Sequence, residues 1–541
     1  MTGHSRNDAL DHVVVLMFEN RSFDNLLGRL YQPGEVKSFE GVVGKKLSNP
    51  IPGWAEHGSD RKTVPYGLAK TMDTPNPDSG EEYQHQNTQL FGGIEPETNR
   101  FKLAERMAAP YNAPAGRQTP TMDGYVADYI SAFAAEIGRQ PTYDEYAQIM
   151  TGYAPEQMPV ISGLARGFAT FDHWFCEVPS QTFPNRSFLH AATSSNLVVN
   201  MSPLDSFPVH NTAETTFERL ESKGLTWRVY CDPPSKISFV GLIHASRLRH
   251  RFADNFLTTD QFLEDARKGE LPTYSFIEPN FLRNHNDMHP AFNALFPGME
   301  FDGPSSLVGG EALLMKIYDA VRSSSSSSGS NAFNTLFLVT FDENGGTYDH
   351  VPPPSIARPV PSAPAGQLGF SFDRSGVRVP AIAVSAWIPE RTVVNEEFRH
   401  TAVIRTLRER WSLGRPFTGR DAIAPNIASI LTLNEPRKPE DWPELIARPA
   451  PSYTAARIPP DAPLKSLPRA LFFGLMALGK ELGQSVPDIS PDDDLKLADA
   501  LAMIGDLFGE MWPALEAGRG DRNEGTLAGA HGDNTITTSR I

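Results

Sequence analysis

The chain has 541 residues, of which 40% are hydrophobic and 21% charged, an ordinary composition for a globular protein with room for more than one structural unit. It carries 49 basic and 65 acidic residues, and the formal charge of −16 argues against a nucleic-acid partner, because binding a phosphate backbone needs a basic surface. Its two cysteines are too few for a disulfide framework.

The sequence contains no recognisable targeting or membrane-spanning signal. The N-terminal stretch MTGHSRNDALDH lacks the apolar centre of a signal peptide and has no twin arginine. No run of apolar residues is long enough to span a bilayer. We therefore expect no transmembrane segment and a cytoplasmic protein, or an exported one if a leader has been removed.

Apolar, partly β-branched runs alternate with amphipathic stretches along the first 450 residues. The predicted strands lie at 13–18, 226–231, 335–341 and 377–389, and the predicted helices at 124–138, 215–224 and 311–323. Strands that alternate with helices in this way predict an α/β sandwich with a mainly parallel sheet.

Changes in composition suggest the domain organisation. Residues 29–120 are rich in Pro, Gly, Asn and charge, and we expect them to be long loop insertions from the sheet, which in compact domains are usually functional. We expect a main domain at 1–450, a helical extension at 451–517 and a disordered polar tail at 518–541.

Oxygen-bearing side chains follow two of the predicted strands. Glu19 and Asn20 follow the first strand, and Asp342 and Glu343 follow the strand at 335–341. Because ligands bind beyond the carboxyl ends of parallel strands, these oxygens suit a divalent cation: Mg, Mn, Ca or Zn. The alternatives are a helix N-cap for the first pair and a turn for the second, since Asn-Gly-Gly follows it.

A hydroxyl group lies in the stretch VPSQTFPNRSFLHAATSS. Thr182 precedes a helix that we expect to begin after Pro184, where the helix field favours an anion and a metal ion would favour an alkoxide nucleophile. Alternatively, Thr182 is only a helix N-cap. Arg186 could hold phosphate oxygens bidentately or pair with a local acid. The sequence has no Walker A, G-x-G-x-x-G, H-E-x-x-H or G-x-S-x-G pattern.

Six blocks of sequence, in the same order, resemble the phosphoesterase family that contains bacterial phosphatidylcholine-type phospholipases C and a branch of acid phosphatases. The blocks are VVVLMFENRSFDNLLG, FDHWFCEVPSQTFPNRSFLHAATS, NDMHP, FLVTFDENGGTYDHVPPP, GVRVPAIAVSAWIP and HTAVIRTLRERW. The resemblance spans roughly residues 11 to 425. It implies an alkaline-phosphatase-like three-layer α/β/α sandwich, with residues 1–450 as the catalytic domain and a C-terminal helical extension.

The resemblance implies roles for single residues. Glu19 and Asn20 match metal ligands after the first strand, and Asp342 and Glu343 match the second ligand pair. Thr182 matches a hydroxyl nucleophile, Ser or Thr in the family, which also contacts the metal.

Three of the histidines in the blocks that carry the resemblance have expected roles. His289, in NDMHP, is similar to a histidine that faces the phosphoryl oxygens of the substrate. His350 lies in the DHVPPP stretch and is either catalytic or a brace for its loop. His400 heads a further block and is expected to be structural.

The sequence departs from the family at residues 77–82, which read PDSGEE where members commonly read PDPGHE. Glu81 stands at the position of the histidine, and His85, four residues later, is the candidate replacement imidazole in catalysis. A carboxylate here would repel a dianionic monoester more than a singly charged diester, which favours diester substrates.

The resemblance implies a metal-dependent phosphoric ester hydrolase with a threonine nucleophile, acting as a phospholipase C-like phosphodiesterase on a small phosphoester or phospholipid headgroup. The alternatives are a broad-specificity acid phosphatase and, less favoured, a non-catalytic binding protein or a sulfatase. The complete set of predicted ligands argues against a decayed site. Metal identity, headgroup, pH optimum and oligomeric state stay open.

Overall fold

The computed structural model describes residues 5–60, 62–116, 118–200, 206–233, 238–281, 285–290, 307–449, 466–481, 485–489, 495–496, 499–500 and 503. The predicted tail at 518–541 and most of the predicted extension at 451–517 lie outside these residues.

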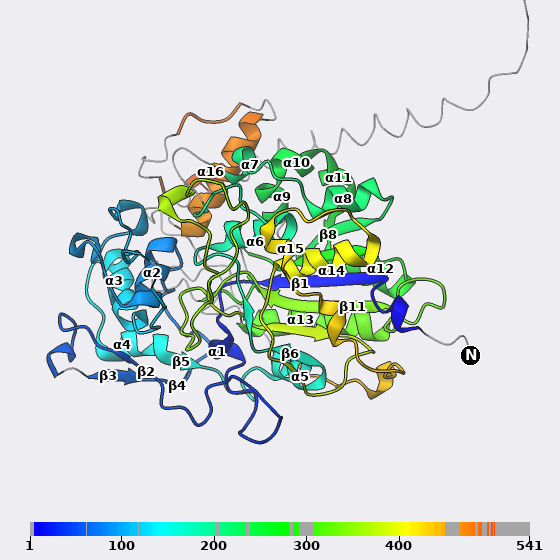
Figure 1. Ribbon diagram of the computed structural model, residues 1–541, viewed down its shortest axis with the longest axis horizontal. Coiled ribbons are helices and arrows are strands. Elements are labelled where there is room, and N and C mark those ends of the chain that lie inside the picture. The colour runs from blue at the N-terminus through cyan, green and yellow to red at the C-terminus, as the bar shows by residue number, and fades with distance from the viewer. Residues whose placement is uncertain are drawn as a thin grey trace, which may run out of the picture.

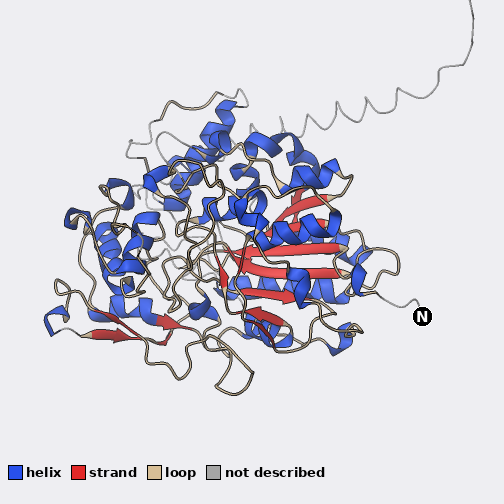
Figure 2. Ribbon diagram, viewed as in Figure 1, coloured by secondary structure: helices blue, strands red, loops and turns tan. Residues whose placement is uncertain are grey.

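An eight-stranded sheet forms the centre of the molecule (Figures 1 and 2). In order across the sheet the strands are β13 (Thr392–Val394), β6 (Ala169–Phe171), β12 (Ala381–Val384), β11 (Thr335–Phe341), β1 (His12–Phe18), β10 (Tyr274–Glu278), β8 (Trp227–Cys231) and β9 (Phe256–Thr258).

The sheet is mostly parallel. β1 pairs in parallel with β11 on one side and β10 on the other, and β8 and β9 continue the parallel series. Only β12, among the strands described, runs antiparallel to both its neighbours. The α/β class and the mainly parallel sheet predicted from the alternation of strands and helices are therefore confirmed.

β1 and β11 occupy the middle of the sheet because their sequences, HVVVLMF and TLFLVTF, are apolar on both faces and almost wholly buried. The strand predicted at 377–389 is shorter in the structure. β12 begins only after Pro380, which has no backbone N–H to donate to a ladder.

Helices cover both faces of the sheet (Figure 2). One layer contains α5 (Pro159–Gly167), α12 (Thr259–Lys268) and α13 (Leu307–Ser323), and the other contains α6 (Thr182–Ala191), α8 (Thr216–Ser222) and α14 (Thr401–Trp411). Shorter or peripheral helices are α7 (Phe207–His210), α9 (Phe239–Ile243), α10 (Ala245–Leu248), α11 (Phe252–Asn255), α15 (Gly419–Ala422) and α16 (Ser466–Glu481). No helix in the described ranges combines the length and apolar character needed to cross a bilayer.

The segment after β1 forms a lobe beyond the carboxyl ends of the central strands, at the left of Figure 1. Its helices are α1 (Phe23–Leu26), α2 (Tyr83–Phe91), α3 (Tyr125–Ile137) and α4 (Tyr143–Ala147), and its short strand pairs are β2 (Ser48–Pro50) with β3 (Thr63–Pro65) and β4 (Gly67–Leu68) with β5 (Thr151–Gly152). A further pair, β7 (Trp174–Phe175) and β14 (Phe398–Arg399), lies outside the lobe.

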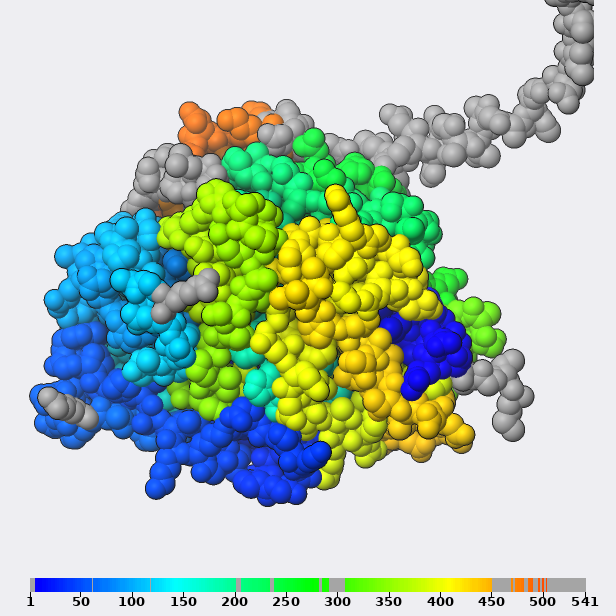
Figure 3. Space-filling model, viewed as in Figure 1, coloured from blue at the N-terminus to red at the C-terminus, as the bar shows by residue number. Residues whose placement is uncertain are grey.

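The lobe packs directly on the segment that follows β11. In Figure 3 its surface, blue to cyan, meets the yellow-green surface of that segment without a break. Arg374 Nη2 donates to Asn87 Oδ1 at 3.3 Å, and the rings of Tyr125 and Tyr348 lie 5.1 Å apart. The loops that follow β1 and β11 are therefore buried between the lobe and the rest of the molecule.

The centre of the sheet supplies a test of the packing. Leu338 of β11 is fully buried between Val15 and Ala383, so Leu338→Ala removes well-packed methyl groups. We expect it to lower the free energy of unfolding by about 2–5 kcal/mol, measured by urea denaturation. Leu68→Ala is the control, because Leu68 is 50% exposed, and it should change the free energy by less than about 0.5 kcal/mol. Equal losses in the two variants would contradict the position of β11.

Candidate active site

The loops that follow β1 and β11 lie against each other. The backbone N–H of Asn20 donates to Asp342 Oδ1 at 3.2 Å, and Asn20 itself has a positive φ of 59°. Gly345, with φ 56°, lies so close that a Cβ atom there would be 2.4 Å from the Asn20 carbonyl oxygen. A glycine is therefore needed for the loop carrying Asp342 and Glu343 to approach the loop carrying Glu19 and Asn20.

Two alternatives, in which Glu19 or Asn20 caps the first helix and Thr182 caps the helix after it, are wrong. Ser22, and not Glu19 or Asn20, caps α1, because its hydroxyl accepts from the backbone N–H of Asn25. Thr182 is the first residue of α6, with Gln181 at the N-cap position, so the helix begins two residues before Pro184 rather than after it. Thr182 therefore lies at the positive end of a ten-residue helix.

Arg186 joins the two loops. Its Nη2 donates to Glu19 Oε1 at 2.7 Å and its Nε to Asp342 Oδ2 at 3.1 Å, while its Nη1 is 3.7 Å from Glu278 Oε1 on β10. The guanidinium is fully buried, and its carbon lies 5.1 Å from the centre of the Phe281 ring. Arg186 therefore pairs with acids, which was one of the two alternatives for this residue. A contact between Arg186 and phosphate stays a prediction.

Four of the five predicted metal ligands each have a buried oxygen atom that lacks a hydrogen-bond partner among the described residues. These atoms are Glu19 Oε2, Asn20 Oδ1, Thr182 Oγ1 and Glu343 Oε1. The other polar atom of each longer side chain is bonded: Glu343 Oε2, for example, accepts from the backbone N–H of Gly345 at 2.6 Å. Leaving a buried polar atom unpaired costs about 1–3 kcal/mol, and more for a charged group. The donor set, all oxygen, fits a hard divalent cation.

The carboxylates repel one another where they converge. Burial, followed by the charge of Asp342, raises the pKa of Glu19 well above its ordinary value. Burial, followed by the charge of Glu81, raises the pKa of Glu343 in the same way. A cation among these groups would relieve the repulsion and stabilise their ionised forms.

Glu81 belongs to this cluster and ends next to Asn20. Its Oε2 accepts from Asn20 Nδ2, and its Oε1 accepts from Gln181 Nε2 at 3.3 Å. His289 Nε2 lies 2.8 Å from Asn20 Nδ2 and 3.7 Å from both Asp78 Oδ2 and Glu81 Oε2. Although burial opposes its charged form, the carboxylates of Asp78 and Glu81 raise the pKa of His289 to about 10.

Asp78 and Gln181, for which the sequence suggests no role, also contact this cluster. Asp78 lies in the PDSGEE stretch, where Glu81 departs from the family pattern. This departure is the feature of the sequence that could have pointed to Asp78. Gln181 directly precedes Thr182, and its contact with a residue 100 positions away has no signature in the sequence.

His85 and His400 bind partners of their own. His85 Nδ1 is 2.8 Å from Asp128 Oδ1, between α2 and α3, and its catalytic role stays a prediction. His400 Nε2 is 2.8 Å from the carbonyl oxygen of Asp342, and its Nδ1 accepts from Trp174 Nε1 at 3.1 Å. That buried position agrees with the structural role expected for His400.

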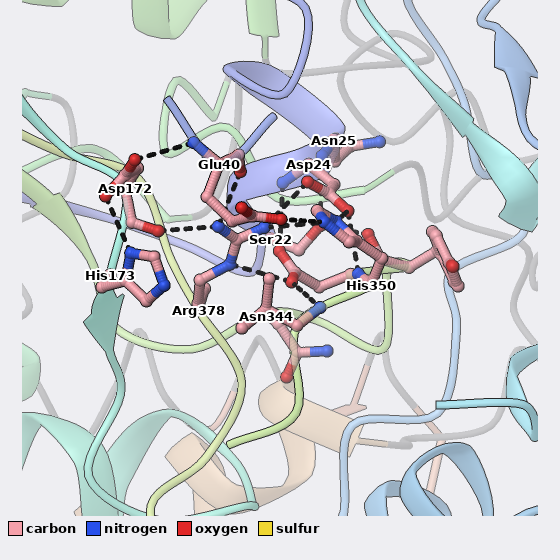
Figure 4. Close-up of polar contacts among 12 residues, drawn as sticks. Ser22, Asp24, Asn25, Glu40, Asp172, His173, Asn344, His350 and Arg378 are labelled. Atoms are coloured by element: carbon pink, nitrogen blue, oxygen red, sulfur yellow. Dashed lines mark hydrogen bonds and ion pairs between the residues drawn. The ribbon is translucent and has the colours of Figure 1, made fainter. Parts of the chain in front are cut away.

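His350 belongs to a second polar cluster, drawn in Figure 4. Its Nδ1 is 2.6 Å from Asp24 Oδ2, and its Nε2 is 2.9 Å from Glu40 Oε1. Arg378, fully buried, donates from Nη2 to Asp24 Oδ1 and from Nε to Asp349 Oδ1, each at 2.9 Å. The geometry favours the brace, and a catalytic role for His350 stays a prediction.

Two groups of three acidic and histidine residues have potential ligand atoms within 4.8 Å of one another. They are Asp24, Asp349 and His350, and Asp78, Glu81 and His289. The first group already contains the positive charge of Arg378. Groups that could hold a metal ion are therefore present in the described part of the chain, and the second group adjoins the predicted ligands.

The chain belongs to the phosphoesterase family, because the family model matches residues 10–414. It is 30% identical to non-specific phospholipase C3 of Arabidopsis thaliana over 96% of this chain and 92% of that protein. It is 27% identical to the non-hemolytic phospholipase C of Pseudomonas aeruginosa over 82% of this chain and 60% of that protein.

Solved structures with similarity to the chain include a protein in the alkaline phosphatase superfamily from Vibrio parahaemolyticus. It is 14% identical, with a TM-score of 0.31, over 50% of this chain and 65% of that one. A phosphonate monoester hydrolase of Agrobacterium radiobacter is 13% identical, with a TM-score of 0.28, over 53% of this chain and 74% of that one.

The cluster in Figure 4 generates a stability prediction. Arg378→Met leaves the buried carboxylates of Asp24 and Asp349 without their shared cation, and we expect a loss of about 3–5 kcal/mol in the free energy of unfolding. The control is Arg251→Met, which breaks a pair with Glu221 that is about one-third exposed, and should cost less than about 1 kcal/mol. Urea denaturation measures both losses. A small loss for Arg378→Met would contradict the inference that Arg378 holds Asp24 and Asp349 together.

His85 generates a pH prediction. Burial opposes its charged form, but the charge of Asp128 and the hydrogen bond to it raise the pKa of His85 from 6.5 to about 9. The folded state therefore holds the proton more tightly than the unfolded state. The stabilisation is complete below pH 6.5 and is lost as the pH rises through 9.

The matching variant is His85→Gln. Below pH 6.5 we expect wild type to exceed this variant in free energy of unfolding by an amount on the order of 3 kcal/mol, and the difference to shrink between about pH 7 and pH 10. Urea denaturation across this range measures it. A difference that does not change with pH would show that His85 is not charged in the folded protein.

Proposed function

We propose that the protein is a metal-dependent phosphoric ester hydrolase with Thr182 as its nucleophile, acting on phosphodiesters of the phospholipid-headgroup type. Membership of the phosphoesterase family supports the reaction class. The names of its relatives, phospholipases C of plants and bacteria, support the substrate class.

One observation carries the proposal: the four buried, unpartnered oxygens belong to the residues that the sequence predicted as ligands. Glu19, Asn20, Thr182 and Glu343 would hold the cation through these atoms. Asp342 would complete the set, although its oxygens already accept from Arg186 and from the backbone N–H groups of Asn20 and Glu343. The cation would neutralise charge on a phosphoryl oxygen and favour the alkoxide of the attacking hydroxyl.

The residues of the chain position the reacting groups and supply an electrostatic field. Thr182 opens α6, so the positive end of the helix favours the developing negative charge on its oxygen during in-line attack on phosphorus. Attack would form the bond from Thr182 Oγ1 to phosphorus and break the bond from phosphorus to one alcohol oxygen, and the departing alcohol would gain a proton as the threonine hydroxyl loses one. Water would then break the Oγ1–phosphorus bond of the phospho-threonine, releasing the phosphomonoester and restoring the hydroxyl. Arg186 holds Glu19 and Asp342 by one oxygen each, which limits how the two carboxylates can rotate.

Glu81 supports a preference for diesters over monoesters. Its carboxylate is within hydrogen-bond distance of Asn20 and Gln181, the latter directly before the nucleophile. A dianionic monoester would meet more repulsion there than a singly charged diester. The acid-phosphatase alternative predicts the opposite preference. Comparing turnover of the diester bis-p-nitrophenyl phosphate with turnover of the monoester p-nitrophenyl phosphate therefore distinguishes the two functions.

Thr182→Val tests the nucleophile. The variant keeps the shape of the side chain but removes the hydroxyl, and we expect turnover of bis-p-nitrophenyl phosphate to fall by about 10³-fold or more. The control is Thr216→Val, because Thr216 is also a buried threonine at the first position of a helix, and its hydroxyl only donates to the His190 carbonyl oxygen. Circular dichroism checks that both variants fold. Full activity in Thr182→Val would end the covalent proposal.

A further inference from the structure

We propose that one face of the molecule docks on the surface of a phospholipid bilayer, with Val360 and Ile423 entering the boundary between headgroups and acyl chains. This face, called the loop face below, consists of residues 193–199, 357–371 and 413–423. The inference rests on the proposed function and deepens it, because a substrate of the phospholipid type is packed in a membrane.

Arg358 gives the loop at 357–371 its shape. Its Nε donates to the Ser371 carbonyl oxygen at 2.8 Å, and its Nη2 donates to the Pro364 carbonyl oxygen at 3.1 Å. The guanidinium thus binds the backbone of both arms of the loop, and the sequence places no other charge in this segment. The loop is therefore closed around an internal charge and leaves Val360 50% exposed.

A second segment extends the apolar surface of the loop. The backbone N–H of Gly419, the first residue of α15, donates to the Pro359 carbonyl oxygen at 2.8 Å. A Cβ atom on Gly419 would lie 2.9 Å from the Arg358 carbonyl oxygen, so α15 packs directly on the loop. Ile423, which follows this helix and is 58% exposed, therefore belongs to a segment that adjoins the loop carrying Val360. In Figure 3 the two segments belong to the yellow-green and yellow surfaces, which lie side by side. Their exposed apolar residues include Val360, Pro361, Pro364, Ala365, Ala422 and Ile423.

The charge of the loop face suits a lipid surface. Its charged residues are Arg358, Arg415, Arg420 and Asp421, and of these four Arg415 is the exposed one. A chain with a net charge of −16 thus has a face whose three segments expose one arginine and no carboxylate. Exposed carboxylates would be repelled by the phosphates of a bilayer, whereas apolar side chains beside a single arginine can enter its headgroup region.

A hollow of about 490 Å³ lies at the edge of the loop face. It is lined by Arg415, Thr418 and Ala422 among others, and Ala422 directly precedes Ile423. Its carboxylate, that of Glu214, is paired with Arg219 at 2.8 Å, so the charge of Arg415 is left over. A guanidinium and a hydroxyl group beside an apolar patch fit the phosphate of a lipid headgroup.

The loop face is connected to the candidate active site. Gln367, in the loop, accepts from the backbone N–H of Val198 through its Oε1 at 2.7 Å. Two residues later the backbone N–H of Asn200 donates to Gln181 Oε1 at 3.0 Å, and Gln181 directly precedes Thr182. A bilayer bound to this face would therefore lie against the segment that ends beside the proposed nucleophile.

A fluorescent label on the full-length chain tests the docking face. Both native cysteines, Cys176 and Cys231, are buried, so a cysteine introduced at the surface can be labelled selectively. Val360→Cys carrying a nitrobenzoxadiazole group should gain intensity and shift to shorter wavelength on dioleoylphosphatidylcholine vesicles, and spin-labelled lipid should quench it. Leu68→Cys is the matched control, since Leu68 is also 50% exposed but lies on β4 in the lobe, and its label should not respond.

Charge substitutions give a second measurement. Val360→Glu and Ile423→Glu should each lower the partition coefficient onto the same vesicles, measured by co-sedimentation, by about 10-fold or more. Turnover of phosphatidylcholine in vesicles should fall with it, while turnover of dissolved bis-p-nitrophenyl phosphate should not change. Ile446→Glu is the control, because Ile446 is 82% exposed and lies outside the loop face, and it should bind vesicles as wild type does.

The outcomes separate the docking face from the proposed function. A label at residue 360 that does not respond to vesicles, or an equal loss of binding in Ile446→Glu, would overturn the docking face. Wild type that hydrolyses bis-p-nitrophenyl phosphate but does not bind vesicles would overturn it and leave the proposed function intact. A dimer that Val360→Glu dissociates, seen by sedimentation equilibrium without vesicle binding, would assign the face to a second copy and overturn the proposal. No turnover of either ester by wild type would contradict the proposed function itself.

Discussion

The convergence of buried carboxylates on one point, with a single arginine between them, is the constraint on which the rest of this structure depends. Glu19, Asp342 and Glu343 are all fully buried at the carboxyl ends of adjacent strands, and Arg186 donates hydrogen bonds to two of them. Like charges held this way in a poorly screened interior are unstable unless protons or cations join them. A bound cation, as in the proposed function, would stabilise this arrangement.

Two buried arginines tie the same pair of loops together. Arg186 joins the residues that follow β1 and β11 directly, and Arg378 joins Asp24 and Asp349 further along the same loops. Between these ties, Ser22 donates from its hydroxyl to the Tyr348 carbonyl oxygen at 2.6 Å. The loops are thus fixed relative to each other before any substrate binds, which is what precise placement of ligand oxygens requires.

The parts of the fold that the sequence predicts are those set by local pattern. Long β-branched runs that end in acids predict β1, β11 and the polar residues that follow them, because burial on both faces and a strand end are visible in a short window. The helix α2 was missed since its sequence, YQHQNTQLF, has no apolar face, although nearly all of it is buried. Its polar side chains are satisfied by distant partners: Gln86 donates to Asn344 at 2.7 Å and Gln89 to Asp128 at 2.7 Å. Such pairings depend on the folded arrangement and leave no periodic signal.

Anomalous X-ray scattering from a crystal soaked in Mn²⁺ tests the central claim most directly, since it locates the ion without reference to activity. The account predicts a peak within about 2.0–2.4 Å of Thr182 Oγ1 and of oxygens from Glu19, Asn20 and Glu343. A peak bound only by other residues, or crystals that bind no ion, would contradict it.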